Sequence, residues 1–181
     1  MNKKKMYFAY GSNINLEQMA IRCPDARPLM PVVLQDYELV YRGSGVATVN
    51  PKRDSVVIGL LWSITPACEK ALDRYEGYPH LYHKTDVAVT DPETGKTYYT
   101  MMYEMDKRYK EPAIPSPYYY SIIEEGYRQN NMDTRSLRKS LGNAKKEVQI
   151  FQKQILFNDL PKEWFSARKH TKEKKDNRQE R

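Results

Sequence analysis

The sequence contains no continuous apolar run long enough to cross a bilayer, so we expect neither a helical membrane span nor a membrane partner. Lys3–Lys5 precede only a short strand-like stretch, so we expect no signal peptide. Cysteine is scarce: the chain has two, Cys23 and Cys68, which form neither a metal-binding nor a redox spacing. We therefore expect reduced thiols in a cytoplasmic protein.

Histidine is also rare, with three in the chain. His80 and His83 have no acidic or cysteine partner at ligand spacing, so we predict no metal site. Ser12 could be imagined as a nucleophile, but no histidine is placed to act as its base. Gly43–Gly45 lacks the following helix that a phosphate-binding loop requires.

The net charge of +7 is unevenly distributed along the 181 residues. Residues 168–181 hold seven Lys or Arg and three Asp or Glu, so this end carries +4 and the rest +3. A segment so polar cannot bury enough surface to fold. We predict a single domain over residues 1–165 and a basic, disordered tail over residues 166–181. We do not expect nucleic-acid binding as the main function.

The strongest local pattern is a strand that ends abruptly in a polar turn. Tyr7–Tyr10 is aromatic and apolar and predicts a strand, Gly11–Asn13 breaks it, and Asn15–Ile21 has the spacing of a helix. Such a turn leaves backbone N–H groups unpaired at the positive end of a helix dipole, which suits a carboxylate or an oxyanion. A tight capped turn without a ligand is the alternative.

The remaining pattern predicts a mixed sheet with short connections. The expected strands are Tyr37–Arg42, Val46–Val49, Ser55–Ile64, Tyr82–Thr90 and Thr97–Glu104, with helices after Thr65–Pro66, over Tyr118–Arg128 and from Asp133. The expected loops include Cys23–Pro28, Asn50–Asp54 and Glu111–Pro117. About six strands with few long crossovers indicate an α/β (α+β) fold, built as a small mixed barrel or highly curved sheet.

Glu76 stands out because it ends a predicted helix just before Gly77. The negative end of the helix dipole disfavours an ionised carboxylate there, and shielding by Tyr75, Tyr78 and Tyr82 would push the pKa of Glu76 further upward. A glutamate tuned in this way can take a proton and return it, as general acid–base catalysis requires. An exposed glutamate at a frayed helix end is the alternative.

Several segments, in order along the chain, resemble the gamma-glutamylcyclotransferase family. They are Tyr7–Asn13, Leu34–Tyr37, Gly45–Val49, Ile58–Trp62, Leu72–Gly77 and Pro115–Tyr119. The resemblance covers about residues 5 to 130 and implies a compact mixed barrel flanked by helices.

The resemblance also implies a reaction and a site. Members of the family cyclise a gamma-glutamyl group, releasing 5-oxoproline and an amine or amino acid, without a cofactor. The family's catalytic glutamate falls on Glu76. Its substrate-binding positions fall on Tyr10, Gly11, Ser12, Asn13, Tyr82 and Tyr119. The amides of the loop would hold either the oxyanion or the alpha-carboxylate, although each tyrosine could instead be a packed core ring.

The branch of the family stays open at this point. Glutathione-specific relatives usually carry leucine in place of Asn13, which argues against that branch. A butirosin-type deprotecting enzyme and a non-catalytic gamma-glutamyl-binding or regulatory module are the alternatives. The partner expected in every case is a small gamma-glutamyl compound, and a homodimer is left open.

Overall fold

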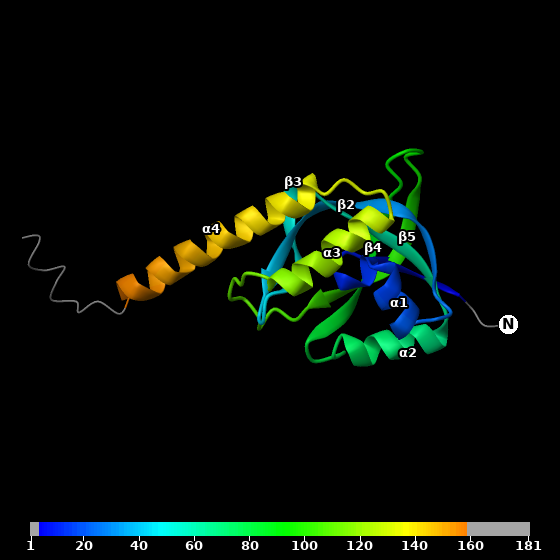
Figure 1. Ribbon diagram of the computed structural model, residues 1–181, viewed down its shortest axis with the longest axis horizontal. Coiled ribbons are helices and arrows are strands. Elements are labelled where there is room, and N and C mark those ends of the chain that lie inside the picture. Colours follow the sequence, from blue (N-terminus) through cyan, green and yellow to red (C-terminus); the bar gives the residue numbers. More distant parts are fainter. Residues whose placement is uncertain (1–3, 159–181) are drawn as a thin grey trace, which may run out of the picture. The chain divides into compact units, whose positions relative to one another are not determined.

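The computed structural model describes residues 4–158, and its sheet is a closed barrel of five strands (Figure 1). The strands are β1 (Lys5–Ala9), β2 (Arg27–Arg42), β3 (Val46–Ile64), β4 (Tyr82–Thr90) and β5 (Thr97–Met105). The helices are η1 (Ser12–Ile14), α1 (Leu16–Arg22), α2 (Pro66–Tyr75), α3 (Pro117–Gln129) and α4 (Arg135–Asn158). The predicted mixed barrel flanked by helices is confirmed, with five strands where about six were expected.

The order of the strands around the barrel is β1–β3–β2–β4–β5. β1 lies antiparallel to β3 and parallel to β5, so that Tyr7 stands opposite both Trp62 and Met101. β2 and β3 form a long antiparallel hairpin, whereas β2 meets β4 through the single pair Val33 and Thr90. β1 thus lies between β3 and β5, and the loop that follows it lies at one end of the barrel.

One predicted loop and the end of another belong to this long hairpin, so both predictions need correction. Asn50–Asp54 continues β3, because Pro51 pairs with Tyr37 and Asn50 with Glu38 across the ladder. β2 begins at Arg27, ten residues before the predicted start at Tyr37, so the prediction that Cys23–Pro28 is a loop is wrong for its last two residues. The side chains from Pro51 to Asp54 are exposed, which is why their polarity resembled that of a loop.

The helix boundaries follow the capping residues. Thr65 accepts a hydrogen bond from the Cys68 amide at the start of α2, and Ser116 accepts one from the Tyr119 amide at the start of α3. Proline follows each cap, as expected at the first position of a helix. Leu72 of α2 and Ile123 of α3 are fully buried in the core.

The chain divides into two compact units, Met1–Val148 and Gln149–Arg181. In the first unit, Arg42 at the end of β2 donates to both carboxylate oxygens of Glu147 on α4, at 2.9 and 2.8 Å. The predicted basic tail, residues 166–181, lies outside the described residues, and a single domain over residues 1–165 stays a prediction. None of the helices within residues 4–158 is long and apolar enough to span a bilayer.

Candidate active site

The turn after β1 contains a separate 3₁₀ turn, η1, rather than the first turn of an α-helix. α1 begins only at Leu16, where Asn15 caps it by accepting a hydrogen bond from the Gln18 amide at 3.0 Å. Within residues 4–158, the N–H groups of Ser12 and Asn13 have no acceptor. The unpaired amides expected from the sequence are therefore present, but they belong to η1 and not to the N-terminus of α1.

Glu76 caps the C-terminus of α2, and the turn around it is fixed by glycine. The Tyr78 amide donates to the carbonyl of Asp73, and Gly77 adopts φ of 64°, the left-handed conformation that glycine tolerates best. Gly77 therefore ends the helix, as predicted. On the preceding turn Asp73 accepts a hydrogen bond of 2.6 Å from the hydroxyl of Tyr103 on β5, which ties α2 to the barrel.

The loop after β1 and the end of α2 meet through a direct hydrogen bond. The side-chain Nδ2 of Asn13 donates to Oε1 of Glu76 at 2.7 Å and to the hydroxyl of Tyr7 at 2.9 Å. Asn13 and Glu76 are 63 positions apart in the chain. Because Asn13 is 3% exposed, this bond between a buried amide and a carboxylate fixes the position of Glu76.

Both residues line a cavity of about 220 Å³ at this end of the barrel. The lining brings together all seven residues that the sequence singled out: Tyr10, Gly11, Ser12, Asn13, Glu76, Tyr82 and Tyr119. It also contains Tyr7, Val46, Ala47, Tyr75, Leu81 and Tyr103. Apart from tyrosines, Glu76 is the only ionisable residue among those that line the cavity.

Burial raises the pKa of the Glu76 carboxyl to about 7, and the Asn13 hydrogen bond and the charge of Arg22 offset part of the rise. The upward direction matches the expectation, but its main cause is desolvation and not the helix dipole. The shielding of the Glu76 carboxyl from water by neighbouring tyrosines also differs in part from the prediction. Tyr82 is 5% exposed, whereas Tyr75 and Tyr78 are 47% and 41% exposed.

The hydroxyls of the predicted tyrosines are hydrogen-bonded to backbone groups. Tyr82 donates to the carbonyl of Ala47 at 2.7 Å, and Tyr119 accepts from the Ala47 amide at 3.1 Å. Tyr10 donates to the carbonyl of Tyr103. Burial raises the pKa of Tyr10, Tyr82 and Tyr119, so all three hydroxyls stay protonated near neutral pH. Tyr119 has no acceptor for its own proton within residues 4–158, so it can donate into the cavity.

Gly11 allows the loop to pass close to α3. A Cβ atom added at Gly11 would lie 3.3 Å from the hydroxyl oxygen of Tyr119 and 3.4 Å from the Cβ of Ala47. Glycine at this position therefore leaves room beside the tyrosine hydroxyl at the wall of the cavity.

Three residues that the sequence pattern did not single out also contact this site. Tyr7 was assigned only to a strand, although its hydroxyl accepts from Asn13, and Tyr103 was likewise assigned only to a strand. Arg22 donates to Oδ1 of Asn13 at 2.6 Å. A cation in the last turn of a helix is an ordinary complement to the dipole, so nothing in the local pattern marked Arg22.

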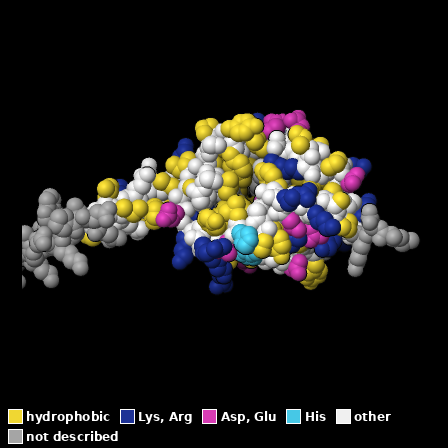
Figure 2. Space-filling view, turned by 90° about the horizontal axis from the view of Figure 1, so that it is seen from below, with side chains coloured by type: hydrophobic (Ala, Val, Ile, Leu, Met, Phe, Trp, Pro, Cys, Tyr) yellow, Lys and Arg dark blue, Asp and Glu magenta, His cyan; other side chains and the backbone are white. Residues whose placement is uncertain are grey.

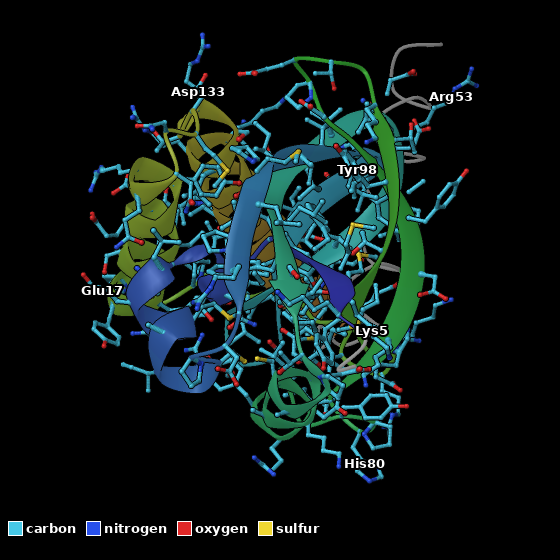
Figure 3. The ribbon with its side chains drawn as sticks, turned by 90° about the vertical axis from the view of Figure 1, so that its right-hand side faces the viewer. Lys5, Glu17, Arg53, His80, Tyr98 and Asp133 are labelled. Carbon is cyan, nitrogen blue, oxygen red and sulfur yellow. The ribbon has the colours of Figure 1, made fainter. Side chains whose placement is uncertain are left out.

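The other candidates lie apart from the cavity. His80 is exposed and points away from the barrel (Figure 3), and His83 lies 3.9 Å from Glu104. Cys23 and Cys68 are buried free thiols. Within the part of the chain that the structure describes, His, Cys, Asp and Glu side chains form no cluster of three that could hold a metal ion.

Comparisons with known proteins identify relatives of this chain. A family model described as "Gamma-glutamyl cyclotransferase, AIG2-like" matches residues 7–121. The human protein named gamma-glutamylcyclotransferase is 32% identical over 138 residues, which cover 70% of this chain and 72% of that protein. A bovine protein of the same name is 29% identical over 145 residues, or 74% of this chain and 76% of that protein. A solved structure titled "Gamma-glutamyl cyclotransferase" has a TM-score of 0.70 at 30% identity, covering 76% of this chain and 86% of that chain.

Proposed function

The chain belongs to the gamma-glutamyl cyclotransferase family, and from this premise we propose that it converts a gamma-glutamyl amine or amino acid into 5-oxoproline and the free amine. The observation that carries the proposal is the carboxylate of Glu76, held 2.7 Å from Asn13 in a cavity that also contains the unpaired amides of the loop. Its pKa of about 7 suits a group that must accept and release protons near neutral pH.

The proposed reaction begins with proton transfer from the substrate's alpha-ammonium group to Glu76. The free amine attacks the side-chain carbonyl carbon and closes a five-membered ring, and the bond to the leaving nitrogen then breaks. The attacking nitrogen loses two protons in forming the lactam and the leaving nitrogen gains two. Glu76 can carry these protons one at a time, so the cycle needs no further proton source.

The loop supports the proposed transition state by binding negative charge. The N–H groups of Ser12 and Asn13 have no acceptor within residues 4–158, and the Tyr119 hydroxyl can donate into the same cavity. Such donors stabilise an oxyanion or hold the alpha-carboxylate of the substrate, because they are already oriented when charge develops. The protonated tyrosines cannot serve as bases near neutral pH, which leaves that role to Glu76.

The nucleophile is part of the substrate, so the protein mainly has to fold the substrate and manage its protons. For this reason the proposal includes no cofactor. We also retain the cytoplasmic setting expected from the sequence, which is compatible with Cys23 and Cys68 being free thiols.

The test is release of 5-oxoproline from a panel of gamma-glutamyl amino acids and gamma-glutamyl amines. We expect turnover of at least one class, and a loss of about 10²–10⁴-fold in kcat/KM for Glu76→Gln, because glutamine keeps the shape but cannot take a proton. Glu17→Gln is the matched control, since Glu17 lies on α1, is exposed and points outward (Figure 3).

Equal rates for Glu76→Gln and the wild type would remove Glu76 from the mechanism. Binding of a gamma-glutamyl compound without any turnover would identify the chain as a non-catalytic binding module. Calorimetry distinguishes this outcome from a panel that lacks the right leaving group, because it shows whether a compound saturates the site although it is not turned over.

A further inference from the structure

Arg22 lies behind the cavity wall, outside the cavity lining, and is held by several contacts. Its Nη1 donates to Oδ1 of Asn13 at 2.6 Å and to the hydroxyl of Ser12 at 3.3 Å, and its Nη2 donates to Gln18 at 2.7 Å. The guanidinium carbon lies 3.7 Å from the centre of the Tyr75 ring. Because the planar guanidinium is held on several sides, it is a rigid donor for Asn13.

We propose that Arg22 is a positioning residue that fixes the orientation of the Asn13 amide and thereby holds the carboxylate of Glu76. The inference rests on the proposed function, and it assigns to Arg22 a role that it exerts through Asn13 and without touching the substrate.

The two ends of the Asn13 amide group make different contacts. Oδ1 of Asn13 accepts from Arg22, and this leaves Nδ2 to donate to Glu76 and to Tyr7. If the amide turned over, its oxygen would face the carboxylate of Glu76 and its NH₂ would face the guanidinium. Both contacts would be repulsive, so Arg22 selects the orientation in which Asn13 donates to the base.

Arg22 also acts on Glu76 through its charge. Burial raises the pKa of the Glu76 carboxyl, while the Asn13 hydrogen bond and the positive charge of Arg22 lower it. The other titratable residues that line the cavity with Glu76 are tyrosines: Tyr7, Tyr10, Tyr75, Tyr82, Tyr103 and Tyr119. Burial raises the pKa of Tyr7, Tyr10, Tyr82, Tyr103 and Tyr119, so these hydroxyls stay neutral and Arg22 supplies the charge that opposes the rise at Glu76.

The first experiment measures the titration of Glu76 without any substrate. Protein labelled with ¹³Cδ-glutamate is titrated by NMR, and the signal of Glu76 is assigned by its loss in Glu76→Gln. We expect Arg22→Met to raise the midpoint by about one pH unit, because it removes a nearby cation and releases the Asn13 amide. Arg22→Lys keeps the charge and is expected to return the midpoint most of the way to that of the wild type.

The second experiment measures kinetics with the best substrate of the panel. We expect Arg22→Met to lower kcat/KM at pH 7 by about fivefold or more, since a midpoint about one unit higher leaves about a fifth as much ionised Glu76. At pH 9 Glu76 is ionised in every variant, so only orientation differs. There Arg22→Met should lower kcat in the wild-type background and add less than about twofold in an Asn13→Ala background, because the two residues act in series.

Arg74→Met is the matched control, because Arg74 is exposed and also lies in the last turn of a helix, close to Glu76. It should leave the midpoint and the rates unchanged. An unmoved midpoint in folded Arg22→Met, or fully additive effects with Asn13→Ala, would overturn the inference. If Arg22→Met does not fold, Arg22→Lys takes its place. A lower kcat of Arg22→Lys at pH 9 then supports the inference, and an unchanged kcat overturns it. If the wild type turns over no substrate, the proposed function fails while the NMR titration still decides the role of Arg22.

Discussion

At the scale of single residues, the burial of Glu76 that would serve the chemistry also lowers the stability of the fold. Its pKa is about 7 in the folded protein, against an ordinary value of 4.5. Below pH 4.5 the carboxyl is protonated in both the folded and the unfolded chain, and its full contribution to stability is present. As the pH rises toward 7, the unfolded chain ionises first, so stability is lost until the pH has passed through the folded pKa.

This linkage predicts that Glu76→Gln is more stable than the wild type at alkaline pH. At pH 8 the free energy of unfolding should rise by about 3 kcal/mol, because glutamine can accept the Asn13 hydrogen bond without carrying a buried charge. At pH 4.5 most of the difference should vanish. Urea unfolding at both pH values measures it, with Glu17→Gln as the exposed control. An equal difference at both pH values would show that Glu76 titrates normally.

The residues predicted from sequence stood out because each broke a local rule, and the structure brings them to one cavity. The carboxylate before Gly77 at a helix end can be recognised from one short segment of the sequence. The turn at Gly11–Asn13, with its unpaired amides, can be recognised from another. The contact of Arg22 with Asn13 was not predictable in the same way. This contact depends on how the short helix α1 packs against the loop before it. The only local signal in the sequence is a cation in the last turn of a helix, which is ordinary.

At the scale of elements, the position of the loop depends on how closely α3 approaches it. A Cβ atom added at Gly126 of α3 would lie 2.7 Å from the backbone nitrogen of Asn15 and 2.9 Å from the carbonyl carbon of Ile14. Real Cβ atoms do not approach backbone so closely, so the helix or the loop would have to shift. Asn15 caps α1, and α1 carries Arg22, so a shift there would reach the site.

We therefore predict that Gly126→Ala destabilises the protein by about 2 kcal/mol and lowers 5-oxoproline release, although alanine is the better helix former. Gly142→Ala in α4 is the matched control, because a Cβ atom there meets nothing within 4 Å. It should stabilise the protein by about 1 kcal/mol through helix propensity alone. Chemical unfolding measures both effects. A stabilised Gly126→Ala with full activity would contradict the close approach.

The extent of the β2–β3 hairpin could not be predicted, for reasons that also lie at this scale. Proline and polar residues normally interrupt strands, and both predicted loops contained them. In the barrel β2 meets β4 through a single pair, so one edge of β2 can tolerate Pro28 and Pro31. The ladder also shifts register between Pro28 and Met30. Such a case is decided by pairing between positions tens of residues apart, such as Pro28 with Trp62, and a window of local sequence does not contain both.

At the scale of the whole molecule, the residues of the proposed active site all come from one part of the chain. Every residue that lines the cavity falls between Tyr7 and Tyr119, within the match to the family model and within the unit Met1–Val148. On the face shown in Figure 2, Asp and Glu side chains lie among Lys and Arg side chains. Of the net charge of +7, +4 belongs to residues 168–181. The basic character is thus separate in sequence from the residues of the cavity.

Deleting residues 168–181 should therefore leave kcat/KM for 5-oxoproline release within about twofold of the wild type, since no residue of the cavity is removed. Any affinity for single-stranded RNA should be weak, fall steeply with salt and disappear with the deletion, because binding by such a segment is electrostatic. Fluorescence anisotropy over a salt series measures this. Loss of turnover on deletion would show that residues 168–181 contribute to the active site. RNA affinity retained after the deletion would show that RNA binds to the rest of the chain instead.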